Sequence, residues 1–399
     1  MRILNPGNFG KLQGSSPTNI LITRKISKYF ILGYNFGSWI VASPIVWDKS
    51  TNKSQLVSSW KLRLWTVNIS MAVLYAIFVE ARALTICMDS SKSTSEKMYM
   101  MFLIPYFVAS LIVHLVVWQN KERMVAFNNE CFRFASKFEK QYIREYTKQP
   151  WILKFIGFAV QLTYISIIET VALMTANAFI RADSPDMPSS LWSSSPTIFD
   201  RVISAAIMCH TISMFASSCF LILMSLFTSS GLILAVNAEL SSKAILTTPD
   251  FKRSGLRKLR MWRILQIIIK VFNEIFCFVF LPCYKFLGSC LVVFCGYAGL
   301  KMEGIHAHVL MLVGSYVFVL LLLTFSFLAE FHFQSTAVLK EFKDRLEWDL
   351  NRHWVLRHLR ALVPLRADMR SKYFIDRGMV LTLAHILVTN TASFLLVNT

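Results

Sequence analysis

Seven long apolar segments constrain the fold of this chain more than any other feature of its sequence. Each has about the length that an α-helix needs to cross the roughly 30 Å hydrocarbon core of a bilayer. Hydrophobic residues make up 55% of the chain, in agreement with this pattern. We therefore predict an all-α membrane protein with seven transmembrane helices. The segments are 62–86, 98–119, 154–179, 202–236, 275–299, 305–330 and 378–399.

The basic residues fall on alternate connections between these segments. The N-terminal arm and the second, fourth and sixth connections contain 33 of the 42 lysines and arginines, whereas the first, third and fifth contain 5. Because basic residues accumulate in cytoplasmic loops, this split predicts a cytoplasmic N-terminus. With an odd number of spans, the C-terminus is then extracellular. The net charge of +19 follows from these loops, so we expect no binding of nucleic acid.

The predicted cytoplasmic N-terminal arm, residues 1–61, contains an apolar stretch at 26–47 that glycines, a serine and Pro44 interrupt. We interpret this stretch as a membrane-skimming or re-entrant helix, and the alternative is a further span. A glycosylation sequon begins nearby at Asn52. With the N-terminus inside, Asn52 stays unmodified, so a glycan there would reverse the predicted orientation.

Three cytoplasmic connections, 121–148, 256–266 and 335–350, carry apolar residues at helical spacing. Such stripes on charged helices favour burial against partner helices over an amphipathic helix on the membrane surface. The segment 202–236 is longer than a bilayer requires, so it must tilt, kink at Gly231 or project into the cytoplasm. Together these features predict that the cytoplasmic helical extensions form an assembly bundle. The stripes are Phe127, Cys131, Phe134, Phe138 and Tyr142; Leu256, Leu259 and Trp262; and Val338, Leu339, Phe342, Leu346 and Leu350.

The sequence contains no catalytic motif and no metal-ligand spacing among its eight cysteines, so we predict neither an enzyme nor a cofactor. Polar residues inside spans are costly and tend to be functional. Glu169 lies far from either end of its span, and a structural hydrogen bond and a ligand contact are equally open for it. Aromatic and polar residues at the same predicted outer level allow an outward-facing ligand pocket: His210, Tyr297, His308 and Tyr316.

The last segment, 378–399, carries polar residues at helical spacing on an otherwise apolar sequence: Thr382, His385, Thr389 and Ser393. A polar stripe is unfavourable in contact with lipid, so it faces either other helices or water. One helix cannot enclose a pore, but copies from several subunits around a symmetry axis can. Packing between helices and a shared aqueous pore are therefore the two interpretations.

The chain resembles the insect gustatory and odorant receptor superfamily. The gustatory-receptor signature is Thr-Tyr, five hydrophobic residues and Gln-Phe. The end of this chain matches its spacing and keeps Thr391, but Ala392, Asn398 and Thr399 replace the tyrosine, glutamine and phenylalanine. The stretch Tyr373–Arg377 is similar to the sequence that leads into the last helix of these receptors. The seven segments and the predicted orientation are similar as well.

The resemblance implies a tetrameric ligand-gated cation channel in the plasma membrane of sensory neurons. The implied partners are a small tastant or odorant, identical or related receptor subunits, the lipid bilayer and permeant cations. It implies a ligand pocket within 62–330, anchor helices at 331–377 and a pore-lining helix at 378–399. Because the signature changes at its end, the candidates for the gate are Leu395, Leu396, Asn398 and Thr399.

Two other classes of membrane protein remain as alternatives. A G-protein-coupled receptor requires an external N-terminus, and the sequence lacks elements of the DRY and NPxxY type at the expected span ends. A secondary transporter is disfavoured because we find no internal repeat and no inverted pair of broken helices. Epitope accessibility at the N-terminus separates the first alternative from a channel, and substrate flux identifies the second.

Overall fold

The computed structural model confirms the all-α class and the seven predicted segments. Among the residues that it describes, seven helices are long and apolar enough to cross a membrane. They are α2 (Ser59–Met88), α3 (Thr94–Tyr142), α4 (Trp151–Ile180), α5 (Ile198–Leu240), α8 (Phe280–Lys301), α9 (Ile305–Leu346) and α11 (Arg377–Val397). The described residues are 21, 24–48, 50–143, 151–191, 195–241, 244, 246–302, 305–346, 361–369 and 373–397.

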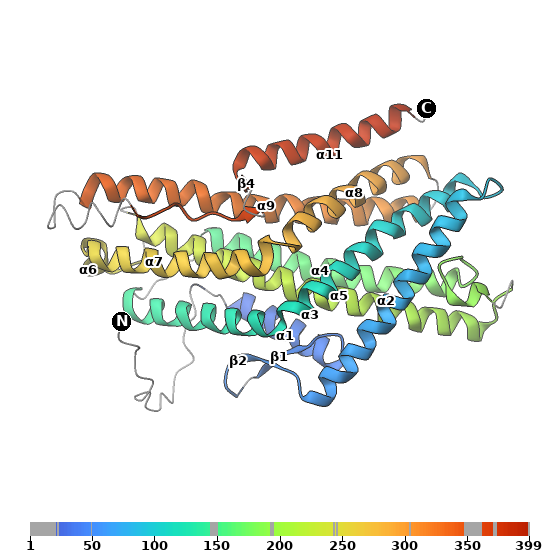
Figure 1. Cartoon of the computed structure of the whole chain (residues 1–399), viewed down its shortest axis with the longest axis horizontal. Helices are drawn as coiled ribbons and strands as arrows, with labels where there is room; N and C mark the ends of the chain where they lie inside the picture. Colours follow the sequence, from blue (N-terminus) through green and yellow to red (C-terminus); the bar gives the residue numbers. More distant parts are fainter. Residues whose placement is uncertain are drawn as a thin grey trace.

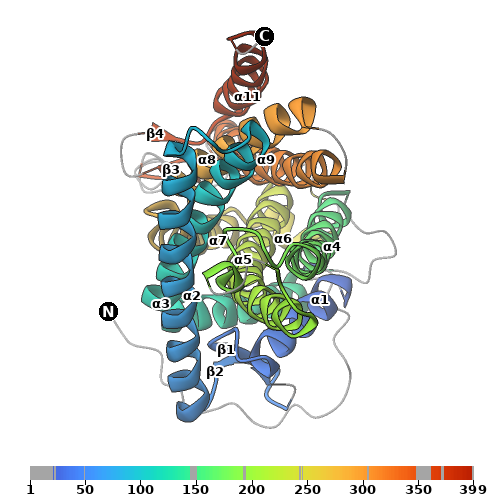
Figure 2. The same ribbon diagram turned by 90° about the vertical axis from the view of Figure 1, so that its right-hand side faces the viewer.

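The spans form an elongated bundle around α5 (Figures 1 and 2). The most apolar window of α5 is 94% buried, whereas that of α11 is 11% buried. α11 lies along one side of the bundle, where it contacts α8 and α9 (Figure 1). Its C-terminal end lies at the same end of the molecule as the connection between α2 and α3 (Figure 1). Thus one span is largely uncovered by its own chain.

Shorter elements complete the described chain. A helix, α1 (Arg24–Trp39), packs on α4 and α5. Two antiparallel hairpins join β1 to β2 and β3 to β4. The remaining elements are β1 (Ile45–Asp48), β2 (Lys53–Leu56), the 3₁₀-helix η1 (Pro188–Leu191), α6 (Pro249–Arg253), α7 (Gly255–Phe272), the π-helix η2 (Asn273–Cys277), β3 (Asp368–Met369) and β4 (Tyr373–Phe374).

The prediction of a helix over 26–47 is wrong in its second half. α1 ends at Trp39, Val41 has a positive φ of 54°, and the chain then enters β1. Pro44 supplies a physical reason, since it has no backbone N–H and excludes the helical conformation from the residue before it. The oxygen of Pro44 instead accepts a hydrogen bond from the Val57 N–H at 3.0 Å, which closes the hairpin.

The predicted stripes are buried within a single chain. Phe138 of α3 meets Phe251 of α6 with ring centroids 5.7 Å apart, and Trp262 of α7 meets Phe342 of α9 at 5.8 Å. These contacts confirm burial against other helices. Leu256 is an exception, because it is 57% exposed. Leu350 and the side chain of Leu346 lie outside the described part of the chain.

Gly231 does not interrupt α5, which is one continuous helix of 43 residues. At 1.5 Å per residue its length is roughly 65 Å, so α5 extends well beyond a bilayer core. A Cβ at Gly231 would lie 2.3 Å from Ile156 Cδ1 of α4. The glycine therefore permits close packing of α4 and α5 instead of a kink.

We expected the segment 275–299 to be one regular helix, and it is not. It begins in the π-helix η2, and α8 starts only at Phe280. Pro282 explains the break: it has no N–H to donate to the carbonyl of Phe278, and its ring crowds that carbonyl. The widened turn is a local irregularity of the kind often found at functional sites.

Candidate functional site

A cavity of about 160 Å³ lies between α3, α4, α5, α8 and α9. Aromatic side chains supply much of its wall, namely Tyr106, Phe215, Phe280, Tyr284 and Tyr316. An apolar cavity of roughly 150 Å³ in another protein holds a molecule as small as benzene. The cavity therefore suits a small, compact and largely apolar molecule.

Few polar groups of the wall are available to a bound molecule. Ser166 Oγ donates to the Thr163 carbonyl at 3.0 Å, and Thr170 Oγ1 donates to the Ser166 carbonyl at 2.7 Å. Tyr106 and Tyr284 differ, because their buried hydroxyls have no hydrogen-bond partner within the described part of the chain. Ligand sites of this kind combine an apolar wall with a few polar groups that fix orientation. Because the Tyr284 hydroxyl lies beside Thr324, Tyr106 is the group that best fits this role.

Two of the five predicted ligand residues are in contact with each other. Tyr316 Oη of α9 donates to Glu169 Oε2 of α4 at 2.5 Å. Tyr316 lines the cavity, whereas Glu169 is only half-buried and is not part of the wall. The contact shows that Glu169 has a structural hydrogen bond, which was one of the two interpretations of this residue.

The other three predicted ligand residues lie away from the cavity. His210 is exposed on α5. Tyr297 packs against Phe394 of α11, with ring centroids 5.7 Å apart. His308 is exposed beside a separate surface hollow. The sequence placed these residues at one depth, but it did not show which helix faces point toward each other.

Apart from Ser166 and Thr170, the cavity residues that the sequence did not reveal are apolar or aromatic. Phe215, Phe280 and Tyr284 resemble ordinary core residues in the sequence, because nothing in their spacing separates a cavity wall from a packed interface. The break at Pro282 was the available signal near two of them. It marks an irregular helix start beside Phe280 and Tyr284.

The polar stripe of α11 is exposed. The helix packs through Leu383 and Leu387, which are 2% and 1% exposed, and through the half-buried Thr391. At about 100° per residue, the stripe lies nearly opposite this packed face. The exposed residues include all four predicted members: Thr382, His385, Thr389 and Ser393.

The gate candidates differ in their placement. Leu395 lines a hollow of about 580 Å³ between α11 and the helices α8 and α9. Leu396 is 76% exposed and lies on the side of the polar stripe. Asn398 and Thr399 lie outside the described residues. Among the two leucines, Leu396 is therefore the one that shares a face with the stripe.

A buried polar cluster ties the α4–α5 connection to α2, α3 and α4. Tyr75 Oη donates to the Asp186 carbonyl at 2.9 Å, and Tyr99 Oη donates to Asp186 Oδ2 at 3.3 Å. Ser184 Oγ donates to the other carboxyl oxygen. Asn177 Nδ2 donates to Tyr99 Oη at 3.0 Å. Burial raises the pKa of Asp186 above its usual range, although these donors and Arg181 oppose the shift.

This arrangement of seven spans is the fold of the insect chemoreceptors. The chain superposes on olfactory receptor OR5 of the insect Machilis hrabei with a TM-score of 0.61 at 12% sequence identity, covering 94% of this chain and 97% of that chain. For the same receptor in complex with eugenol, the TM-score is 0.62 at 11% identity, covering 93% and 98% of the two chains. No protein-family model matches the chain, and no curated protein matches its sequence.

Proposed function

We propose that this chain is a subunit of a ligand-gated, non-selective cation channel that responds to small, largely apolar molecules. Four copies surround a central pore, and α11 of each copy lines it. Each subunit carries its own ligand cavity between α3, α4, α5, α8 and α9. The channel lies in the plasma membrane with its N-terminus in the cytoplasm, because 33 of the 42 basic residues belong to connections on that side.

The polar stripe on α11 is the observation that carries this proposal. The helix is apolar enough to span a bilayer, yet His385 and three hydroxyl residues are exposed on the face away from the bundle. Exposure of the His385 imidazole to lipid would be unfavourable in free energy. Copies of α11 around a symmetry axis would turn this face toward water and toward the permeant ions.

The cavity supports a small ligand, since its wall is largely apolar and the buried hydroxyl of Tyr106 has no partner within the described residues. The structural neighbour from Machilis hrabei has been described in complex with eugenol, a compact monocyclic phenol. A ligand of similar chemistry suits the volume of the cavity and the hydroxyl of Tyr106. We take monocyclic aromatic alcohols, ethers and aldehydes as the first compounds to test.

Patch-clamp recording from cells that express the chain, alone and with related subunits, tests the proposal. We expect compounds of this panel to evoke cation currents that persist when G-protein signalling is blocked. Thr389→Trp should reduce conductance, whereas Leu381→Trp, which alters an exposed residue outside the stripe, should not. Full conductance in Thr389→Trp would refute the pore assignment.

A further inference from the structure

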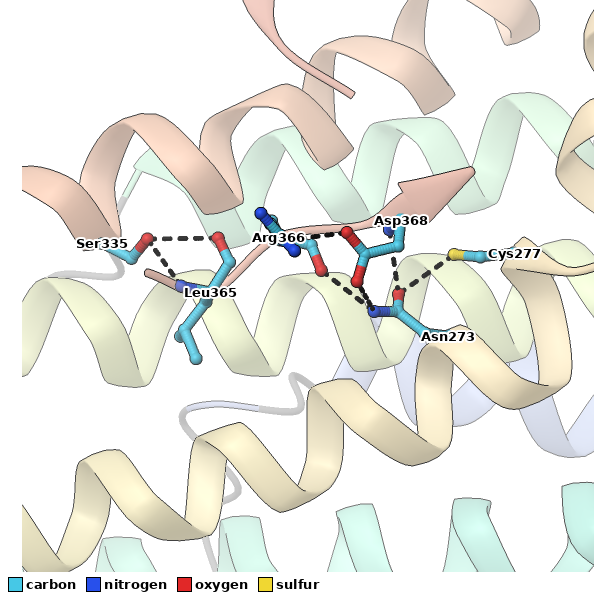
Figure 3. Close-up of polar contacts among 6 residues, drawn as sticks. All are labelled: Asn273, Cys277, Ser335, Leu365, Arg366 and Asp368. Carbon is cyan, nitrogen blue, oxygen red and sulfur yellow. Dashed lines mark hydrogen bonds and ion pairs between the residues drawn. The ribbon is translucent and has the colours of Figure 1, made fainter. Parts of the chain in front are cut away.

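The segment that leads into α11 is fastened to the irregular turn between α7 and α8. Asn273, the first residue of the π-helix, supplies the connection (Figure 3). Its Nδ2 donates to the Arg366 carbonyl at 3.1 Å and to Asp368 Oδ2 at 3.2 Å. Its Oδ1 accepts from the Asp368 N–H at 3.4 Å and from Cys277 Sγ at 3.1 Å.

The chemistry of these partners requires an amide at position 273. The Arg366 carbonyl needs a donor, and the Asp368 N–H needs an acceptor. Only a side chain with both groups in one plane can bridge them, as a neighbouring strand would. The ion pair between Arg366 Nε and Asp368 Oδ1, at 2.9 Å, is largely exposed and adds little stability. The amide is thus the main polar link at this point.

The described residues of the fastened segment are packed into the protein as far as the start of α11. Leu365, Ala367 and Met369 are each 1% exposed or less. The Ile375 N–H donates to the Ala367 carbonyl at 3.0 Å, two residues before α11 begins. Because this bond joins Ala367 to the residues just before α11, a shift of 366–368 would also shift the start of α11.

α9 holds the same segment at two other points. Ser335 Oγ donates to the Leu365 carbonyl at 3.1 Å and accepts from its N–H at 3.0 Å (Figure 3). At the base of α11, Arg377 forms an ion pair with Glu330 at 2.5 Å. These contacts hold the segment against α9, whereas Asn273 connects it to the opposite neighbour, the junction of α7 and α8.

On its other side, the π-helix adjoins the ligand cavity. Phe280 and Tyr284, in the first turns of α8, line the cavity. The next residue, Lys285, has its Nζ 5.8 Å from the ring centroid of Tyr373 in β4. The π-helix places Asn273 within two turns of the start of α8, in an irregular turn of the kind often found at functional sites. Resting on the proposed function, we propose that Asn273 is a positioning residue that couples the cavity wall to α11. Ligand that displaces the start of α8 moves the pore helix through the Asn273 amide.

The test compares Asn273→Ala with Gln266→Ala in the full-length chain. Gln266 of α7 is the matched control, because its Nε2 donates to the Val363 carbonyl of the same segment at 3.2 Å but lies before the π-helix. The probe is the panel compound that evokes the largest wild-type current, with eugenol included. Two quantities are measured: current per receptor at the cell surface, and the thermal shift that the compound produces in purified protein.

For Asn273→Ala we expect an unchanged thermal shift with current per surface receptor lowered by about tenfold, within the usual range of coupling energies. Gln266→Ala should retain both. A purely structural role of Asn273 would lower surface expression but not the ratio of current to the number of receptors at the surface. If Asn273→Ala does not reach the surface, Asp368→Ala, which keeps the two backbone bonds, should lower the ratio in the same direction. A wild-type ratio in the variant overturns the coupling. If the wild-type protein itself shows a thermal shift but no current, the channel function is overturned instead.

Discussion

Tyr106 places a buried phenol hydroxyl at the ligand cavity without a hydrogen-bond partner in the described chain. Burial of an unpaired hydroxyl lowers stability by about 1–3 kcal/mol. Such a group is maintained at a stability cost, which fits a role in ligand recognition. Two opposing effects then follow from its removal.

Tyr106→Phe should raise the melting temperature of the purified protein, because the unpaired hydroxyl is lost. It should also raise the half-maximal concentration for phenols by about tenfold, the effect of roughly one lost hydrogen bond. Apolar analogues of the same size should keep their wild-type potency. Concentration–response curves for matched pairs of compounds measure this, and an equal loss for both members of a pair would exclude Tyr106 as the polar contact.

Asp186 provides a pH-dependent stability term at the α4–α5 connection. Its raised pKa means that the folded state holds the proton more tightly than the unfolded state does. Its stabilising effect is thus complete below the unfolded-state pKa, about 4, and is lost as the pH rises through the folded-state pKa. As the pH rises through this window, the melting temperature of Asp186→Asn should therefore increase relative to that of the wild type. Thermal melts of both proteins at several pH values test the sign, and a constant difference would contradict it.

At the scale of elements, α11 has one packed face and one polar exposed face. Leu387 belongs to the first and Thr389 to the second, although they are only two residues apart. The Gly296 position also shows close packing, because a Cβ there would lie 3.0 Å from Thr391 Cγ2. Close packing against α8 and α9 thus sets which face of α11 points outward.

Cysteine substitution on α11 distinguishes these faces. In Thr389→Cys channels, a water-soluble thiol reagent should reduce the current, since the new thiol would face the proposed pore. Leu387→Cys should behave like the wild type, which controls for the eight native cysteines. Modification of Leu387→Cys but not of Thr389→Cys would mean that the helix is rotated relative to the proposed pore.

At the scale of the whole molecule, orientation and assembly decide what the faces do. Asn52 lies in the turn between β1 and β2, is exposed and has a φ of 56°. It is thus sterically open to glycosylation if this side of the molecule is extracellular. The acceptor side chain of the sequon is therefore exposed, whereas Ser54 of the same sequon is buried.

We expect full-length protein from insect or mammalian cells to lack a glycan at Asn52. An epitope tag at the N-terminus should be labelled only after permeabilisation, whereas a tag at the C-terminus should be labelled on intact cells. Mass spectrometry of the Asn52 peptide and surface staining provide independent measurements. A glycan, or N-terminal staining of intact cells, would reverse the orientation and with it the proposed outer mouth of the pore.

Local sequence features predicted much of the architecture. Helix length and apolar composition identified all seven spans, because backbone groups in a bilayer must be satisfied within each helix. Spacing at 3.6 residues identified the stripe from Thr382 to Ser393 and the buried face of α3. Irregular segments were predicted less well, as the hairpin after Trp39 and the π-helix at Asn273 show, since a single proline alters the hydrogen bonds of residues around it.

By itself, the sequence determined the number of spans, the charge asymmetry and the polar face of the last helix, all of which depend on residues close together in the chain. Only the tertiary structure decided that Tyr316 meets Glu169, that His210 and His308 lie outside the cavity, and that Asn273 holds the segment before α11. These contacts join residues tens to hundreds of positions apart. They depend on the rotation and close approach of packed helices, which steric fit sets and which the composition of one helix does not encode.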